Sequence, residues 1–401
     1  MNGSWLLKER ERARQAYHDS PNPGRSGRLW KYTDPSLFAA PDDPPSPRDS
    51  GCIIYPTVPA GYARAGVTVE DLADAATGRP ELVSRYLGRA VGAGAGKLPA
   101  LNMASWRDGM LVHVPRGREI LDPLHLATNV GSAGLNLTRL LVVAEEGSSL
   151  TLVDAYMGGE QDSPNVKSGS GFDAGTGAQV NAVVEIFAGD GARIKYVTVQ
   201  DLGKKAVIHL TQRTVAGRDS RVDTVTVSMG AAAMKADIGT VLQSTGAESE
   251  SWGIIVGDGN QHYDHHTVHL HEGKSTKSRF NYKAILNGSA RSVYTGLIRI
   301  APGAVGCEAY QENRNLMLSD TARADSVPEL EIMNNEVQCT HGATVSPLEP
   351  EQVFYLESRG IPRQEAVRMI VSGFAEPAFA RLPEGLRGHL RRHLELRLES
   401  L

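Results

Sequence analysis

Between about Met103 and Val345 the chain alternates apolar and polar residues with a period of two. This alternation is typical of β-strands, in which successive side chains point to opposite faces. Glycine or small polar residues separate the alternating runs. The clearest runs are Ser149–Val153, Arg193–Val199, Arg221–Val227, Arg279–Leu286, Ser292–Tyr294 and Leu297–Ile300. We therefore predict a mainly β body in the centre of the chain.

The glycines between these runs recur at long intervals. Gly191, Gly217, Gly246 and Gly273 follow one another at steps of 26, 29 and 27 residues. Antiparallel hairpins would need turns about every 8 to 12 residues, whereas a period in the high twenties is typical of repeat architectures. Two or three short strands per period fit one coil of a right-handed parallel β-helix, and a β-sandwich is the weaker alternative.

Helical patterns precede this body. Ser4 is a candidate N-cap for a helix that reaches Tyr17, and a second helical stretch runs from Thr68 to Arg89, with Thr68 as its expected cap. We expect a mostly helical region over residues 1–100, with a proline-rich linker at 41–50, and a β-helix core over 101–347.

Helical patterns also follow the body, in a C-terminal domain over residues 348–401. The segment Glu349–Gly360 is helix-like and ends in glycine, and Pro362 opens a second helix. A third helix after Pro383 repeats leucine every four positions, at Leu386, Leu390, Leu394 and Leu398. A stripe this regular favours core packing over a partner surface.

One segment interrupts the β pattern. Gly158–Gln179 is rich in Gly, Ser, Asp and Asn and has almost no apolar residue. A tolerated surface insertion is the favoured interpretation, and a mobile lid is the alternative.

Composition and charge exclude several classes of protein. The chain has 401 residues, a formal net charge of −4 and three cysteines, at positions 52, 307 and 339. Their spacing excludes a disulfide framework, a zinc ribbon and a CxxC redox pair, and favours a reducing, cytoplasmic setting. No apolar run resembles a signal peptide or a membrane span, and no excess of Lys and Arg indicates nucleic-acid binding.

A glycine-rich segment at Gly92–Leu98 resembles a phosphate-binding loop only superficially. The pattern requires glycine where this chain has Val91, and Ser or Thr where it has Leu98. We therefore reject nucleotide binding at this segment.

Five histidines fall within ten residues. On a strand, His265, His269 and His271 are expected on one face, and His262 and His266 on the other. Three imidazoles of one strand spread over about 20 Å, too far for all three to bind one ion, so only His269 with His271 could form a metal pair. Imidazoles at partner-facing or solvent positions are the favoured alternative.

A Cys-x-His pair is the sharper candidate site. In an extended segment Cys339 and His341 lie on the same face, about 6.6 Å apart. A neighbouring imidazolium lowers the pKa of a thiol, and thiolate binds soft metals. From these residues alone, a buried inert cysteine beside a hydrogen-bonded histidine is favoured. Cys52 and Cys307 are interpreted as small apolar residues.

Further motifs follow one another in a fixed order along the chain. They are Trp30–Asp34, Gln311–Ser319, Pro328–Ile332, Val337–Val345 and Phe354–Ile361. Together these segments resemble the SufB/SufD family, the β-helical scaffold proteins of the Suf iron–sulfur cluster assembly machinery, and the D member (SufD) most closely.

The resemblance bears on the site residues individually. The cysteine and histidine of the D-type pattern Cys-x-His-Gly-Ala-Thr fall on Cys339 and His341. B-type scaffolds have a cysteine at the position similar to Asn313, and glutamates where this chain has Thr340 and Gly342. The resemblance therefore implies that Cys339 and His341 border iron or a nascent cluster, and it argues against autonomous cluster building by this chain.

The resemblance implies a non-catalytic scaffold subunit. A SufB-type subunit would pair with it through the β bodies, and the C-terminal helices would dock the ABC-type ATPase SufC, which would hydrolyse ATP. The candidate docking residues are Phe354, Tyr355, Leu356, Arg359 and Gly360. A transient iron–sulfur cluster or iron is implied at the interface with SufB, and no tightly bound cofactor on the isolated chain.

Other interpretations remain open at this stage. The chain could form a SufB-like homodimeric scaffold, or a homodimer when it is alone. A β-helical metal-binding module could use the histidine run. A polysaccharide-active β-helical enzyme is less favoured, because such proteins are usually exported.

Overall fold

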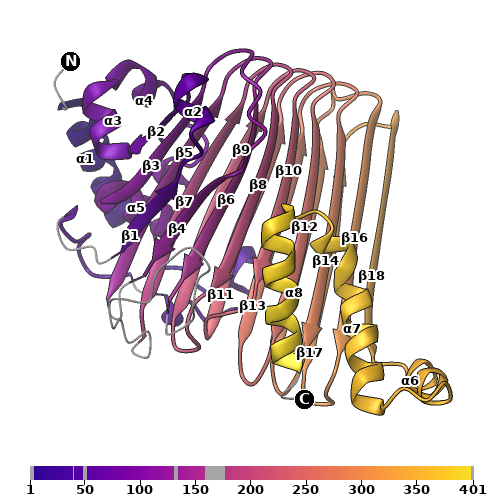
Figure 1. The fold of residues 1–401 in the computed structure, drawn as a ribbon. Coiled ribbons are helices and arrows are strands. Elements are labelled where there is room, and N and C mark those ends of the chain that lie inside the picture. Colours follow the sequence, from indigo (N-terminus) through magenta and orange to yellow (C-terminus); the bar gives the residue numbers. More distant parts are fainter. Residues whose placement is uncertain (1–3, 39, 48–51, 131–133, 159–176, 399–401) are drawn as a thin grey trace.

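The computed structural model describes residues 4–38, 40–47, 52–130, 134–158 and 177–398. Its centre is a β-solenoid of two facing sheets, and helices lie at both ends of the chain (Figure 1). The mainly β fold predicted from the alternating pattern is therefore confirmed. The 158–179 excursion lies almost wholly outside the described residues, and so does the end of the 41–50 linker.

Each coil of the solenoid contributes one strand to each sheet. Sheet A has the order β1-β4-β6-β8-β10-β12-β14-β16-β18, and sheet B has the order β17-β15-β13-β11-β9-β7-β5-β3-β2. The strands of sheet A are β1 (Ile53–Thr57), β4 (Leu124–Asn129), β6 (Ser149–Met157), β8 (Arg193–Asp201), β10 (Arg221–Ser228), β12 (Glu248–Gly257), β14 (Lys277–Leu286), β16 (Cys307–Met317) and β18 (Val337–Pro347). The strands of sheet B are β2 (Thr68–Asp71), β3 (Asp108–Val114), β5 (Leu135–Ala144), β7 (Gln179–Ala188), β9 (Val207–Ala216), β11 (Ala233–Leu242), β13 (His262–His271), β15 (Arg291–Ile300) and β17 (Arg323–Ile332).

Almost all neighbouring strands are parallel and in register. Arg193, Arg221, Glu248 and Lys277 pair in turn along sheet A, so the coils repeat at intervals close to those predicted from the glycines. Among the strands that the structure describes, only the short β1 and β2 pair antiparallel, with β4 and β3 respectively. Long-range parallel pairing explains why no hairpin signal accompanied the strand pattern.

Side chains at every second position point into the space between the sheets. Aliphatic residues predominate in the first coils, although Asp154 and Tyr156 also point inward there, whereas the later coils place many more polar and aromatic groups inside. One inward ladder of sheet A runs through Tyr196, Thr224, Ser251, Phe280 and Gln311. The interior is therefore buried without being uniformly apolar.

Two C-terminal helices cover the outer face of sheet A. The C-terminal domain comprises α6 (Pro350–Glu357), α7 (Arg363–Phe379) and α8 (Glu384–Leu398), and α7 and α8 lie against the sheet (Figure 1). Leu390, Leu394 and Leu398 are buried in a cluster with apolar residues of the sheet. The core-packing interpretation of the leucine stripe is therefore confirmed, because only one face of α8 meets the sheet.

The N-terminal helices cover the first strands of sheet B. They are α1 (Ser4–Asp19), α2 (Gly61–Arg64), α3 (Leu72–Gly78), α4 (Pro80–Tyr86) and α5 (Lys97–Ser105). The helix expected from Thr68 is wrong in its first turn, since Thr68–Asp71 forms β2 instead. The carboxylate of Asp71, not Thr68, caps α3 by accepting from the N–H groups of Ala73 and Asp74.

The segment 28–38 forms a strap over the outer face of sheet B. Trp30 stacks on His209 of β9, with ring centroids 5.7 Å apart. The Thr33 hydroxyl lies 2.9 Å from Nε2 of His262 and also donates to Asp264, both on β13. The motif Trp30–Asp34 thus ties the N-terminal region to the middle of the solenoid.

Several turns between the strands require a positive φ angle, and glycine occupies these positions. Gly147, Gly191, Gly246 and Gly288 have φ between 61° and 74°, a backbone conformation that residues with a Cβ disfavour.

Within the part of the chain that the structure describes, no helix is long and apolar enough to cross a membrane.

Within the described residues, no strand pairs with the outer edges of the last coil. Strands β17 and β18 are the final strands of their sheets, and their residues are largely exposed or half-buried. Figure 1 shows β18 at the end of the body opposite the N-terminal helices. The outer hydrogen-bonding edges of both strands therefore face outward at the same end.

Candidate functional site

Cys339 and His341 lie on β18, at the open end of the solenoid. Cys339 pairs with Ala309 and His341 pairs with Gln311, and both partners point inward from β16. Cys339 and His341 therefore share the inward face, as the spacing predicted. Because no further coil follows, Cys339 is only half-buried and His341 is exposed.

Burial governs the chemistry of the thiol in this chain. Desolvation raises the pKa of Cys339 above its ordinary value, and the nearby thiol of Cys307 acts in the same direction. The expectation that a neighbouring imidazolium lowers this pKa is therefore wrong for the chain by itself. A metal ion or a cationic group brought by a partner would be needed to favour the thiolate.

Apolar side chains are also exposed on the last two strands and just after β17. Ile332 is 42% exposed, Met333 57% and Val345 50%. Long strands with free edges and exposed apolar residues readily pair with another chain. The geometry can thus bring ligands from a second protein next to Cys339 and His341.

The histidine run forms β13, and its two faces alternate as predicted. His265, His269 and His271 point into the solenoid and are fully buried, whereas His262 and His266 lie on the outer face. The favoured expectation of solvent or partner-facing imidazoles is wrong for the three inward residues. It failed because both faces of β13 are covered, one by sheet A and one by the N-terminal strap.

The inward imidazoles contact hydroxyl groups of the opposite sheet and of the turn before β14. Nε2 of His269 lies 3.1 Å from the Ser251 hydroxyl, and the two ring nitrogens of His271 lie 2.7 Å from Thr276 and 2.8 Å from Ser278. Burial lowers the pKa of His271 to about 4, so its ring is neutral near pH 7. Among the described residues, no group of three or more His, Cys, Asp or Glu side chains could hold a metal ion.

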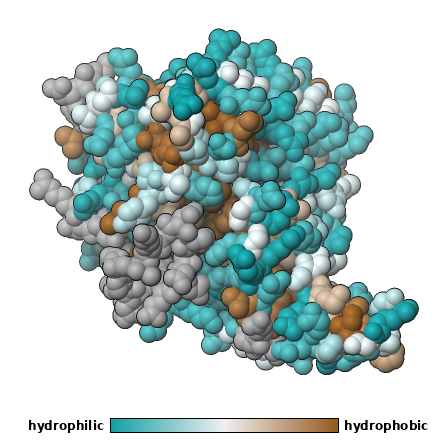
Figure 2. Space-filling view, viewed as in Figure 1, coloured by the Kyte–Doolittle hydropathy of each residue, from teal (hydrophilic) through white to brown (hydrophobic). Residues whose placement is uncertain are grey.

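The α6 region presents the second candidate surface. Phe354 is 70% exposed and Tyr355 57%, and the guanidinium of Arg359 lies 5.3 Å from the Tyr355 ring. Leu356 is half-buried, and Gly360 ends the segment with a φ of 83°. Figure 2 shows apolar surface at the tip of the molecule that α6 forms.

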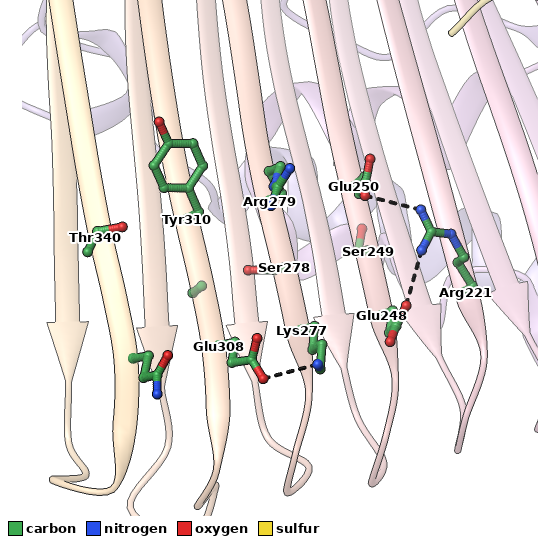
Figure 3. A pocket seen from close by; sticks show the side chains of 12 residues that line it. Arg221, Glu248, Ser249, Glu250, Lys277, Ser278, Arg279, Glu308, Tyr310 and Thr340 are labelled. Atoms are coloured by element: carbon green, nitrogen blue, oxygen red, sulfur yellow. Dashed lines mark hydrogen bonds and ion pairs between the residues drawn. The ribbon is translucent and has the colours of Figure 1, made fainter.

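A groove of about 470 Å³ lies on the outer face of sheet A, near its open end (Figure 3). Charged residues of alternating sign line it, and Arg221 pairs with Glu248 while Lys277 pairs with Glu308. Thr340 of β18 closes one side of it. Cys339 and His341 point to the opposite face of the same sheet, so the groove is separate from that site.

Sequence reasoning missed the apolar rim of the open end. Ile332, Met333 and Val345 look like ordinary strand or turn residues in the sequence, because alternation does not reveal which strand is last. The only available signal was the change from strand to helix pattern after Pro347. Similarly, Asn313 gave no sign of its buried position, where its amide donates to the backbone carbonyl of Tyr282.

Comparison with known families covers most of the chain. A family model described as the SufBD core domain of SUF system FeS cluster assembly matches residues 126–374. A second model, the SufBD protein N-terminal region, matches residues 56–126.

Similar proteins come from bacteria and chloroplasts. The iron–sulfur cluster assembly protein SufD of Bacillus subtilis is 31% identical over 81% of this chain and 72% of its own length. The SufBD family protein slr0074 of Synechocystis is 30% identical over 84% of this chain and 70% of its own. The chloroplastic SufBD family protein ABCI8 of Arabidopsis thaliana is 28% identical over 84% of this chain and 60% of its own.

Proposed function

Because this chain belongs to the SufBD family of the SUF system for iron–sulfur cluster assembly, we propose that it is a SufD-like, non-catalytic scaffold subunit. It pairs with a SufB-type scaffold, docks the SufC ATPase and supports iron acquisition and nascent cluster assembly. The observation that carries this proposal is the open last coil, which holds Cys339 and His341 at an edge where another β body can dock.

Pairing at this end would bury the apolar rim. Ile332 and Val345 lie on the two strands whose outer edges are free, so a partner strand beside each would satisfy backbone groups and cover apolar surface together. A second copy of this chain offers the same edges, and a homodimer is the alternative occupant.

Cys339 and His341 would then border the iron or nascent cluster at this interface. Imidazole and thiolate both ligate iron, and two ligands leave coordination positions for a partner's residues. Iron or a nascent cluster is therefore held transiently at the interface. Asn313, at the B-type cysteine position, is buried and hydrogen-bonded within the solenoid, which favours the D-like role over the B-like role.

The ATPase docks on α6. Phe354 and Tyr355 expose aromatic surface on a helix that stands away from sheet A, and aromatic residues with arginine are typical anchors of protein interfaces. ATP hydrolysis belongs to the partner, in line with the rejected phosphate-loop motif.

The test of the proposal is cluster assembly by the reconstituted complex with the SufB-type and SufC proteins of the same genome. His341→Ala is expected to lower the assembly rate about tenfold or more through loss of a ligand, while the complex still forms. Gln338→Ala, on the outward face of the same strand, is the matched control and should keep the normal rate. Undiminished assembly by H341A would remove the role of His341.

Docking is tested by capture of SufC on the full chain. Phe354→Ala with Tyr355→Ala should abolish capture, whereas Leu7→Ala, also at an exposed apolar residue, should leave it unchanged. Point substitutions are preferable to removing residues 349–401, because that deletion would uncover the apolar outer face of sheet A. Full capture by the double variant would place the ATPase elsewhere.

A further inference from the structure

Several buried polar groups in the central coils lack a protein partner. Gln212 and Thr214 on β9, Thr240 on β11 and His269 on β13 are each at most 1% exposed. Among the described residues, both amide atoms of Gln212, the hydroxyls of Thr214 and Thr240, and Nδ1 of His269 have no hydrogen-bond partner. Such groups are rare inside proteins, because each one costs free energy unless something bonds to it.

These groups form one patch on the inner wall of sheet B. Thr214, Thr240 and His269 pair in register on three consecutive strands, which are about 4.8 Å apart. Gln212 lies two residues before Thr214 and therefore on the same inward face. Four side chains that each have at least one unpaired polar atom are thus neighbours within the solenoid.

The chemistry of the patch fits a small neutral ligand that both donates and accepts hydrogen bonds. Burial holds the pKa of His269 well below its ordinary value, so the ring is neutral, with one nitrogen that donates and one that accepts. Its Nε2 already contacts the Ser251 hydroxyl, which leaves Nδ1 for another partner. Amide and hydroxyl groups complete a set of uncharged donors and acceptors, as buried water requires.

An aromatic side chain bounds the patch toward the open end. The ring of Phe280 stacks on His269 with centroids 3.8 Å apart. Along the same inward ladder, Gln311 and then His341 follow Phe280. The patch is therefore enclosed and separate from the site at Cys339 and His341.

We propose that the central coils enclose a cluster of bound water on the patch formed by Gln212, Thr214, Thr240 and His269. These waters are a structural part of the solenoid, since they complete the hydrogen bonds that the two sheets do not make with each other. The proposal is independent of the scaffold function and would stand if that function proved wrong.

Isosteric substitutions in the full chain give opposite results for a wet and a dry patch. If water is bound, Thr240→Val and Thr214→Val each remove a partner of that water, and the thermal midpoint should fall by about 1 to 3 °C. If the patch is dry, each substitution removes an unpaired buried hydroxyl, and the midpoint should stay or rise. Thr267→Val is the control, because its hydroxyl already donates to Tyr294 and its loss should lower the midpoint in either case.

A crystal structure at atomic resolution provides the direct readout. We expect electron density for water within hydrogen-bond distance of Thr240 and His269, and loss of at least one of these waters in T240V. A patch without such density, or a midpoint raised by both valine substitutions, would overturn the proposal.

Discussion

Arg139 and Glu185 form an ion pair that has no exposed surface. Their side chains approach to 2.6 Å between the outer face of sheet B and the N-terminal region, and Glu185 also accepts from the backbone N–H groups of Gly88, Ala90 and Val91. Arg139 in turn donates to the carbonyl of Val91. One buried pair therefore connects the solenoid to the loop after α4.

Breaking this pair should be costly. Arg139→Ala leaves a buried carboxylate without its cation, and we expect the free energy of unfolding to fall by about 3 to 5 kcal/mol in urea titrations. Glu146→Ala, which breaks the exposed pair with Arg116, should cost less than about 1 kcal/mol. Similar losses in both variants would contradict the importance of burial.

Asp154 gives a prediction for pH. It is fully buried inside the first coils, and desolvation raises its pKa to about 6, although the Tyr196 and Tyr156 hydroxyls donate to it. Since the folded state holds this proton more tightly than the unfolded state, the carboxyl's contribution to stability is present at low pH and is lost as pH rises through about 4 to 6.

Asp154→Asn should therefore gain stability relative to the wild type as pH rises. We expect the difference in unfolding free energy to shift in favour of D154N by about 3 kcal/mol between pH 4 and pH 7. Urea titrations of both proteins at each pH measure this difference. The contributions of the buried histidines to the pH dependence are the same in both proteins and cancel. A difference that does not change with pH would show that Asp154 has an ordinary pKa.

At the scale of single elements, the two last strands are the long edge strands of the solenoid, whereas the other edge strands, β1 and β2, have only five and four residues. Strand β18 has 11 residues and β17 has 10, which is long enough for extensive pairing. No helix among the described residues lies over either edge (Figure 1). Substitutions on the free side of these strands should therefore change the affinity for a partner more than the stability of the isolated chain.

Val345→Asp should weaken pairing with a SufB-type partner at least about tenfold, because a desolvated charge would face the partner's apolar surface. The chain by itself should keep its stability, since Val345 is half exposed. Sedimentation or calorimetric titration measures the pairing. Leu121→Asp, at a residue that is 84% exposed near the first coils, is the control. Equal affinity of V345D and wild type would place the interface elsewhere.

The terminal helix α8 behaves as a core element. Leu394 is 1% exposed against the outer face of sheet A, so Leu394→Ala should lower the free energy of unfolding by about 2 to 4 kcal/mol. Leu396 on the opposite face is 65% exposed, and Leu396→Ala should cost under about 0.5 kcal/mol. Denaturant titration compares the two, and a large loss for L396A would mean that another surface covers it.

The sequence predicted features that depend on local geometry, and it did not predict features that depend on which other element packs against a strand or helix. The strands, the coil repeat and the leucine stripe of α8 were predictable, because period-two and period-four patterns follow from local geometry. The inward position of His265 and His269 was not, since alternation separates two faces without saying which one is buried. The pair Cys339 and His341 was found from its spacing, whereas its place on the last strand depends on long-range pairing.

Across the whole molecule, each coil contacts mainly its two neighbours. Stability in such repeat proteins is approximately a sum of coil and interface terms, and terminal coils have one interface fewer. Amide hydrogen exchange should therefore be fastest in β17 and β18 and slowest in the central strands from β8 to β14. Slow exchange in β18 of the isolated chain would contradict this gradient, and protection of β18 only in the complex would support pairing there.

The two ends of the solenoid differ in the length and direction of their edge strands. At the first coils the edge strands β1 and β2 have only five and four residues and run antiparallel to their neighbours, whereas the opposite end offers long parallel edges. Head-to-tail stacking into filaments would need both ends to be compatible. If pairing uses only the long edges of β17 and β18, as proposed, association by these sheets stops at two solenoids, and a protein built from open β coils can remain a discrete assembly.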